Sequence, residues 1–239
     1  MVKIKVSVIL PTYNEAGNIV KLVEAIREAL VLKHISNEII IVDDDSPDKT
    51  GLLAEKYFSK LPNVRVIIRK KEKGLATAIR TGLEAAVGEV AVVMDTDFNH
   101  DPRLVPTLVK QCQKNDFVVG SRFIKGGGME NKTREQLSCW FNILVKIVLG
   151  SPVHDNLSGF FAIRCDELEK LNFDKIFWGY GDYFMRLIYL AKQQGNQFAE
   201  APAYYRNREY GASKSQFLKM FREYLMSAFL IRFGKSFHD

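Results

Sequence analysis

The chain has 239 residues, of which 47% are hydrophobic and 26% are charged, a globular composition that excludes intrinsic disorder. It has no uncharged apolar run of 18 residues, and its three cysteines are far apart, so neither a membrane span nor a disulfide framework is expected. The net charge of +6 indicates an anionic partner, without choosing between nucleic acid, nucleotide and lipid headgroup.

Short β-branched runs alternate with helical patterns through the first half of the chain. The runs are almost continuously apolar, which is typical of strands buried on both faces of a parallel sheet. The predicted strands cover 6–10, 38–42, 64–68, 90–94 and 117–119, and the predicted helices cover 18–32, 50–59, 75–87 and 103–114. This alternation predicts a doubly wound, mostly parallel α/β sheet with flanking helices.

The second half of the chain has a less regular pattern. Three consecutive glycines at 126–128 predict a flexible loop, and the patterns that follow predict a helix over 135–149, a strand over 158–164 and a helix over 182–194. The segment 215–233 is long and amphipathic, with Phe217, Met220, Phe221, Leu225, Ala228, Phe229 and Arg232 on one face. It is interpreted either as a core helix that covers the sheet or as a helix that lies on a membrane surface.

Ligands of such sheets bind outside the carboxyl ends of the strands. Every predicted strand is followed there by polar or charged residues, namely PTYNE at 11–15, DDDS at 43–46, Arg69 with Lys70, Lys71 and Lys73, DTD at 95–97, and GSR at 120–122. Two of these strand ends are acidic and two are basic. We therefore expect this edge of the sheet to form the functional site.

The two carboxylates of Asp95 and Asp97 are the most informative feature of this edge. Side chains two residues apart at a strand end can face the same way, and oxygen ligands of this kind suit Mg²⁺ or Mn²⁺. Alone, such a pair is more often two loop caps, but here it lies opposite a second acidic strand end, which favours a metal. His100 is interpreted as a loop histidine, because the four histidines do not cluster at metal-ligand spacing.

The run from Asp43 to Asp45 places three negative charges together, which is costly unless they are solvated or paired. One of these residues is expected to cap the next helix, and another to accept a hydrogen bond from a ribose hydroxyl or a base. Neither a G-x-G-x-x-G motif after the first strand nor a phosphate-binding P-loop motif is present, so a dehydrogenase or P-loop enzyme is not expected.

Eight motifs occur in order between about residues 4 and 220: PTYNE, VDDDSPDKT, KEKGLATA, VVMDTDFNHDP, GSRF, KGGG, SGFFAIR and REYGASK. Together they resemble the polyprenol-phosphate mannose synthases, which include dolichol-phosphate mannose synthase, within the family-2 glycosyltransferases. The resemblance implies a GT-A fold, which is a Rossmann-like, mostly parallel doubly wound sheet with flanking helices. It also implies a glycosyltransferase domain over 1–214 and a C-terminal amphipathic helix over 215–239.

The resemblance implies a function for each residue that matches one of the family's motifs. Nucleotide-sugar binding is implied for Pro11, Tyr13, Glu15, Val42, Asp44, Asp95, Thr96 and Lys214. Metal binding is implied for Asp95, Asp97 and Asn99, where Asn99 replaces a longer glutamine of the family. Contact with the acceptor phosphate is implied for Arg122, Arg134, Ser138 and Arg208, and the catalytic set is Asp97, Arg122 and Arg208. The Trp-Pro pair of the family near Arg134 is absent, and 131–133 reads Asn-Lys-Thr instead.

The implied activity is metal-dependent, inverting transfer of a hexose, mannose by resemblance, from GDP-mannose to a polyprenyl or dolichyl phosphate. The implied location is cytoplasmic, peripheral to the cytoplasmic face of a membrane. Many members of the family end in transmembrane helices, and this sequence resembles the short catalytic forms. This leaves open a separate membrane-anchoring subunit.

Two other interpretations stay open. In the first, the donor is a UDP-sugar such as UDP-glucose, or the acceptor is a saccharide hydroxyl. A hydroxyl acceptor would need a general base near the metal, whereas a phosphate acceptor would not. From a different class, a non-catalytic basic module that binds RNA or a membrane would explain the net charge. Two carboxylate clusters at the site would repel nucleic-acid phosphates, so nucleic-acid binding is not expected.

Overall fold

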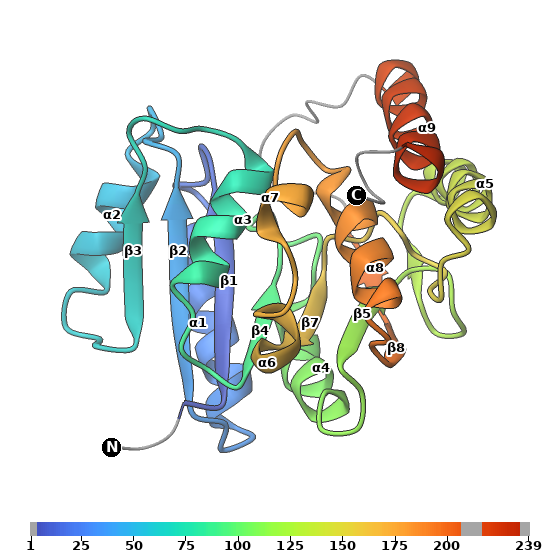
Figure 1. Cartoon of the computed structure of the whole chain (residues 1–239). Coiled ribbons are helices and arrows are strands. Elements are labelled where there is room, and N and C mark those ends of the chain that lie inside the picture. Colours follow the sequence, from blue (N-terminus) through green and yellow to red (C-terminus); the bar gives the residue numbers. More distant parts are fainter. Residues whose placement is uncertain (1–3, 207–216, 235–239) are drawn as a thin grey trace.

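The computed structural model describes residues 4–206 and 217–234 of the chain, built around one seven-stranded sheet (Figure 1). Along the sheet the strands are β3 (Val64–Ile68), β2 (Asn37–Asp43), β1 (Val6–Thr12), β4 (Val90–Val93), β7 (Phe161–Arg164), β5 (Phe117–Ser121) and β8 (Phe198–Pro202). β7 runs antiparallel to β4 and β5, and the other pairs are parallel. The predicted mostly parallel sheet is confirmed.

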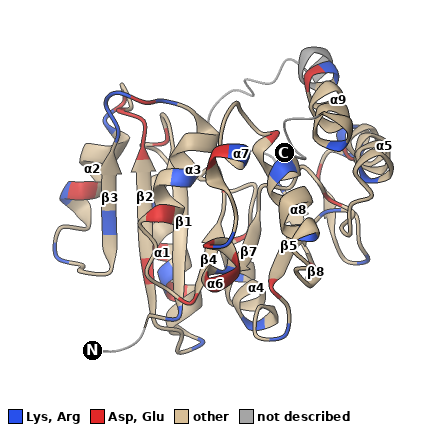
Figure 2. Ribbon diagram, in the orientation of Figure 1, with Lys and Arg blue, Asp and Glu red and all other residues tan. Residues whose placement is uncertain are grey.

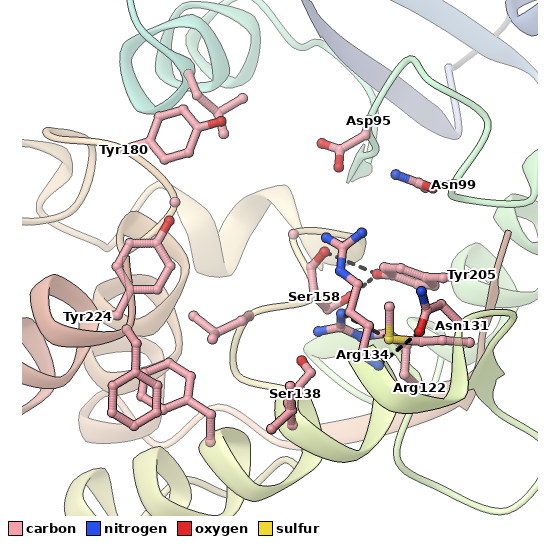
Figure 3. Close-up of a pocket in the computed structure, with 18 of the residues that line it drawn as sticks. Asp95, Asn99, Arg122, Asn131, Arg134, Ser138, Ser158, Tyr180, Tyr205 and Tyr224 are labelled. Atoms are coloured by element: carbon pink, nitrogen blue, oxygen red, sulfur yellow. Dashed lines mark hydrogen bonds between the residues drawn. The ribbon is translucent and has the colours of Figure 1, made fainter. Parts of the chain in front are cut away.

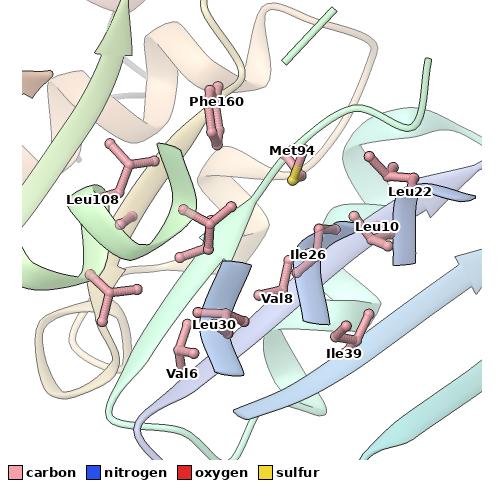
Figure 4. Close-up of a cluster of buried hydrophobic side chains, with 14 of the residues drawn as sticks. Val6, Val8, Leu10, Leu22, Ile26, Leu30, Ile39, Met94, Leu108 and Phe160 are labelled. Carbon is pink, nitrogen blue, oxygen red and sulfur yellow. The ribbon is translucent and has the colours of Figure 1, made fainter. Parts of the chain in front are cut away.

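Helices cover both faces of this sheet. One face carries α1 (Ile19–Val31), α2 (Thr50–Tyr57), the 3-10 helix η1 (Pro102–Leu104) and α4 (Val105–Gln111), and the other carries α3 (Leu75–Glu84), α6 (Cys165–Leu168), α7 (Phe173–Ile176) and α8 (Tyr183–Gln193). Because side chains alternate along a strand, Val8 and Leu10 of β1 pack toward α1 (Figure 4). Ile9, between them, packs toward α3 on the other face. The doubly wound arrangement is confirmed.

Two further helices, α5 (Lys132–Leu149) and α9 (Phe217–Phe233), lie side by side beyond the end of the sheet near α8 (Figure 1). Their shared core with α8 consists of Phe141, Val145, Leu149, Met185, Tyr189, Tyr224, Ala228 and Ile231. Ala228 is therefore buried, although the sequence placed it on one face with Phe229, which is exposed. Within the described ranges, none of the helices has the length and apolarity needed to cross a bilayer.

Some elements differ from the sequence predictions. The predicted loop at 126–128 ends in β6 (Gly128–Met129), which pairs with β9 (Tyr204–Tyr205) in a two-stranded sheet. The helix predicted over 103–114 begins as η1 and stops at Gln111. β8 and β9 were not predicted, because both are short and include Pro202 and the exposed Tyr204, which interrupt the alternation typical of a strand.

Candidate active site

The acidic and basic strand ends meet at one edge of the sheet, as the sequence predicted (Figure 2). Asp44, directly after β2, is buried and forms an ion pair with Arg69, which follows β3. Its second carboxylate oxygen accepts the backbone N–H of Gly74 at 2.7 Å. Asp44 therefore fixes the segment between β3 and α3, and the guanidinium of Arg69 lies at the same edge.

The other two aspartates of this run behave differently. The carboxylate of Asp43 accepts the backbone N–H of Ser46 at 2.9 Å and its hydroxyl at 2.5 Å, which stabilises the turn after β2. Asp45 is exposed, and the following helix has Lys49 rather than an aspartate at its N-cap. The side chain of Val42 is fully buried with Ile40 and Ala78 in the core.

Residues after β1 lie along the same edge. The hydroxyl of Thr96 donates to the carbonyl of Pro11 at 3.5 Å, which joins the ends of β4 and β1. Tyr13 is 43% exposed. The backbone N–H of Glu15 donates to Thr50 at 2.9 Å, and its carboxylate accepts from Asn18 at 2.7 Å. Glu15 thus has a structural role at the start of α1.

The Asp95–Asn99 turn follows β4. The side chain of Asp95 is 44% exposed, whereas Asp97 is buried. The Asp97 carboxylate accepts the backbone N–H of Asn99 at 3.1 Å and its side-chain N–H at 2.8 Å. Two carboxylates and the amide oxygen of Asn99 form an all-oxygen donor set, which is the chemistry that Mg²⁺ and Mn²⁺ prefer. The residues therefore fit such a cation.

His100 lies in a loop, as the sequence predicted, and its side chain is fully buried. Its ring stacks on Phe160 with the ring centroids 4.7 Å apart, and it meets Tyr205 edge-on at the same distance. Burial lowers the pKa of His100 to about 4, so the ring is neutral at pH 7. Its Nδ1 atom can then accept the backbone N–H of Asp95.

A cavity of about 560 Å³ opens beside this turn (Figure 3). Asp95 and Asn99 lie on one side of it, and Tyr180 and Tyr224 lie on another. Its polar floor consists of Arg122, which follows β5, the α5 N-cap Asn131, and Arg134 and Ser138 of α5. Arg134 and Ser138 share a face of α5, because residues four apart in a helix are neighbours. The apolar wall of the cavity consists of Leu137, Phe141, Leu157 and Phe221.

Arg122 is the buried cation of this cavity. Its guanidinium forms a two-pronged ion pair with Asp155, with Nε–Oδ2 and Nη2–Oδ1 distances of 2.7 Å. Burial alone would lower the pKa of Arg122, but the charge and hydrogen bonds of Asp155 outweigh it and raise that pKa above its ordinary value. The ring of Tyr205 lies 4.7 Å from the guanidinium carbon, a cation–π contact. Arg122 therefore stays charged.

The segment 176–182 forms the wall that carries Tyr180. Arg186 of α8 is fully buried and donates to the carbonyls of Ile176 and Trp178 and to the carboxylate of Asp182. Ser227 of α9 donates to the same carboxylate at 3.0 Å. α8 and α9 together therefore hold this wall in place.

Comparisons with known proteins show the family of this chain. The model of the family named "Glycosyl transferase family 2" matches residues 7–171. The chain is 33% identical to the undecaprenyl-phosphate mannosyltransferase of Micrococcus luteus, over 88% of this chain and 87% of that protein. The chain belongs to glycosyltransferase family 2.

Other relatives agree with this family-2 assignment. The dolichol-phosphate mannosyltransferase of Pyrococcus furiosus is 38% identical over 92% of this chain. The chain spans 62% of the length of that relative. Among solved structures, glucosyl-3-phosphoglycerate synthase from Mycobacterium tuberculosis, in complex with Mn²⁺, UDP and phosphoglyceric acid, matches with a TM-score of 0.71. That match covers 95% of this chain and 78% of the other at 22% identity, and it supports the GT-A fold.

The structure gathers the sequence-predicted residues of this family-2 glycosyltransferase into two groups. One cavity is lined by Asp95, Asn99, Arg122, Arg134 and Ser138, and Asp97 accepts a hydrogen bond from Asn99. Pro11, Tyr13, Glu15, Asp44 and Thr96 lie farther along the same edge. Arg208 and Lys214 lie outside the described residues. Four residues that support or line the site were not predicted from the sequence: Asp155, His100, Tyr205 and Tyr224. Ser158, which bonds to Tyr205, lies in the SGFFAIR motif, so the sequence did indicate that position.

Proposed function

We propose that this chain transfers a hexose, mannose in the first instance, from GDP-mannose to the phosphate of a polyprenyl or dolichyl lipid, with inversion at the sugar carbon. The observation that carries the proposal is the cavity itself. Two arginines and a serine lie on its floor, opposite the oxygen ligands of the Asp95–Asn99 turn. The names of the two mannosyltransferase relatives support the sugar and the lipid phosphate.

A bound Mg²⁺ or Mn²⁺ would neutralise the charge that develops on the leaving nucleoside diphosphate. Asp95, Asp97 and the amide oxygen of Asn99 would hold it, with the remaining positions filled by donor phosphates. The nucleoside would extend toward Tyr13 and Asp44 along the strand ends. Arg69, which pairs with Asp44, joins the residues implied by the family motifs as a candidate for this region.

The acceptor needs no dedicated general base. A phosphate monoester has a second pKa of about 6, so its oxygen is already largely ionised at pH 7. The task of the protein is then to bring two anionic phosphates together, which costs Coulomb repulsion unless cations lie between them. Arg122 and Arg134 fulfil this role, because a guanidinium can hold two phosphate oxygens at once. Arg208 and Lys214 are proposed to add to them.

We further propose that residues 1–214 form the catalytic domain and that 215–239 binds the membrane together with α5. The exposed apolar side chains of both helices lie beside the apolar wall of the cavity, and they are Leu137, Trp140, Ile143, Leu144, Ile147, Phe221, Met226, Phe229, Leu230 and Phe233. Arg222 and Arg232 are exposed on the same helix α9. Apolar side chains with nearby cations are how interfacial helices bind anionic lipid.

A transfer assay decides between donors and acceptors. Labelled GDP-mannose and UDP-glucose are each offered to a polyprenyl phosphate, to the matching uncharged polyprenol and to a free saccharide, with Mn²⁺ present. We expect product from GDP-mannose and polyprenyl phosphate alone. Transfer from UDP-glucose would correct the donor, and transfer to a saccharide or polyprenol but not to the phosphate would overturn the acceptor.

A further inference from the structure

Asp155 lies in the segment between α5 and β7 and is fully buried, yet the proposed reaction assigns it no step. Within the described residues, the hydrogen bonds to its carboxylate all come from Arg122. Oδ2 accepts the backbone N–H at 3.0 Å and Nε–H at 2.7 Å, and Oδ1 accepts Nη2–H at 2.7 Å. This pattern fixes both the position of the Arg122 backbone and the rotation of its guanidinium plane.

Nη1 is the one nitrogen of the guanidinium that makes no bond to Asp155, and Arg122 lines the cavity. Nη1 lies 3.8 Å from the sulfur of Met129, a weak acceptor that also lines the cavity. The ring of Tyr205 supports the guanidinium, and Tyr205 is itself held by Ser158 through hydrogen bonds of 2.7 and 3.0 Å. Asp155, Met129 and Tyr205 therefore restrict Arg122 to one orientation, in a cavity that Met129, Tyr205 and Arg134 also line.

The segment around Asp155 is held in place by other contacts. The backbone N–H of Asn156 donates to Asn142 at 2.7 Å, that of His154 donates to Glu200 at 3.0 Å, and Ser158 donates to the carbonyl of Gly120 at 2.6 Å. A buried ion pair contributes little net stability compared with apolar packing. Removing one partner would nevertheless leave the other charge uncompensated and destabilise the fold. The path of this segment does not require the carboxylate, so a positioning role must be tested by kinetics of the folded fraction.

We infer that Asp155 is a positioning residue that aims Arg122 at the acceptor phosphate. The inference rests on the proposed function, because it requires Arg122 to contact that phosphate. In Asp155→Asn the side chain keeps its shape, but the amide N–H₂ meets the guanidinium as a second donor. The guanidinium of Arg122 must then rotate away from residue 155, and it loses the negative charge that balances its own.

The test measures kcat and KM for a short-chain prenyl phosphate, the dissociation constant of GDP, and the folded fraction of each variant. For Asp155→Asn we expect kcat to fall at least tenfold, with unchanged GDP binding and a KM for the acceptor that is equal or lower. A more positive cavity retains the phosphate but holds it in the wrong orientation. Partial unfolding would lower the apparent kcat only in proportion to the folded fraction.

Glu38→Gln is the matched control, because Glu38 is also a buried carboxylate paired with an arginine, Arg65, at 3.0 Å. It lies at the start of β2, at the opposite end of the sheet from the cavity, so this variant should lose stability and keep its kinetic constants. Arg122→Gln should cripple the acceptor step, and Asp155→Asn combined with it should be no slower, since coupled residues are not additive.

The outcomes separate the inference from the proposed function. Loss of the acceptor step in Arg122→Gln, together with wild-type kinetics in Asp155→Asn, would overturn the inference and leave the function standing. Wild-type acceptor kinetics in Arg122→Gln would overturn both. Where Asp155→Asn does not fold, Arg122→Lys is the second probe, because lysine keeps the charge but cannot span both oxygens of Asp155. It should show the same loss of kcat, and a wild-type kcat would overturn the inference.

Discussion

The Nδ1 atom of His100 accepts the backbone N–H of Asp95 at 2.9 Å, so a fully buried ring holds the first residue of the acidic pair. The same ring packs between Phe160 and Tyr205. Tyr205 in turn supports the guanidinium of Arg122. One aromatic stack therefore connects the carboxylates expected to bind the cation with the arginine expected to bind the acceptor.

His100→Phe tests this connection. Phenylalanine keeps the ring and its stacking but removes the acceptor, which leaves the N–H of Asp95 unsatisfied at a cost of about 1–3 kcal/mol. We expect a loss of unfolding free energy of that size in chemical denaturation, and weaker Mn²⁺ binding in the presence of GDP by electron paramagnetic resonance. His154→Gln, at a 54% exposed side chain, is the control and should change neither. Unaltered Mn²⁺ binding in His100→Phe would contradict the positioning role.

Asp97→Asn tests the cation site. The substitution keeps the shape of the side chain but turns one of the two oxygens that accept from Asn99 into a donor, so we expect a stability loss of about 1–3 kcal/mol. Transfer by the folded protein should fall by about 10² or more, because one anionic ligand is lost. Activity should also disappear in excess EDTA and return with Mg²⁺ or Mn²⁺. Asp101→Asn, whose carboxylate pairs with Arg103 on the surface, is the control and should stay active. Full activity after exhaustive dialysis against EDTA would refute metal dependence.

The double variant Trp140→Gln with Ile147→Gln tests the membrane face. Both side chains are 73% exposed on α5, and burying each in a bilayer is worth roughly 1.5–3 kcal/mol. We expect binding to anionic liposomes to fall by about a hundredfold or more in a flotation assay at low salt. Val31→Gln with Leu32→Gln, at similarly exposed sites at the end of α1, should float like the wild type.

If the wild-type protein does not float, the helices do not suffice for membrane binding. Flotation only after addition of a second membrane protein would then indicate a separate anchoring subunit. Wild-type flotation that survives the Trp140 and Ile147 substitutions would move the membrane contact away from this part of α5.

Gly82→Ala tests the packing of α3 on the sheet. A β-carbon at this position would lie 2.3 Å from Cγ2 of Ile9 and 3.2 Å from Cγ2 of Val42. Overpacking costs about 1–3 kcal/mol, and the better helix propensity of alanine offsets at most about 1 kcal/mol of it. We expect a net loss of stability of about 1–2 kcal/mol in urea denaturation. Thr107→Ala, exposed on α4, is the control, and a Gly82→Ala variant as stable as wild type would disprove this packing.

The sequence by itself determined the central sheet and the edge that carries the site. Five strands were predicted to within about two residues, because their apolar runs record burial on both faces of the sheet. Parallel strands bring their carboxyl ends to one edge, so local motifs sufficed to place Asp44 and Arg69 at the same edge as Pro11 and Thr96. The family likewise followed from motif order.

Only the tertiary structure decided how the site is supported. Arg122 and Asp155 are 33 residues apart, and Ser158 and Tyr205 are 47 apart, so no local pattern pairs them. The segment that holds His100 looks like a polar loop, and the rings that bury it come from β9 and the segment before β7. The sequence of helix α9 was consistent with a membrane helix and with a core helix, and the structure gives it one buried and one exposed apolar face. Periodicity reports which residues are apolar, whereas ion pairs and stacked rings depend on contacts between distant segments that form only when the chain packs.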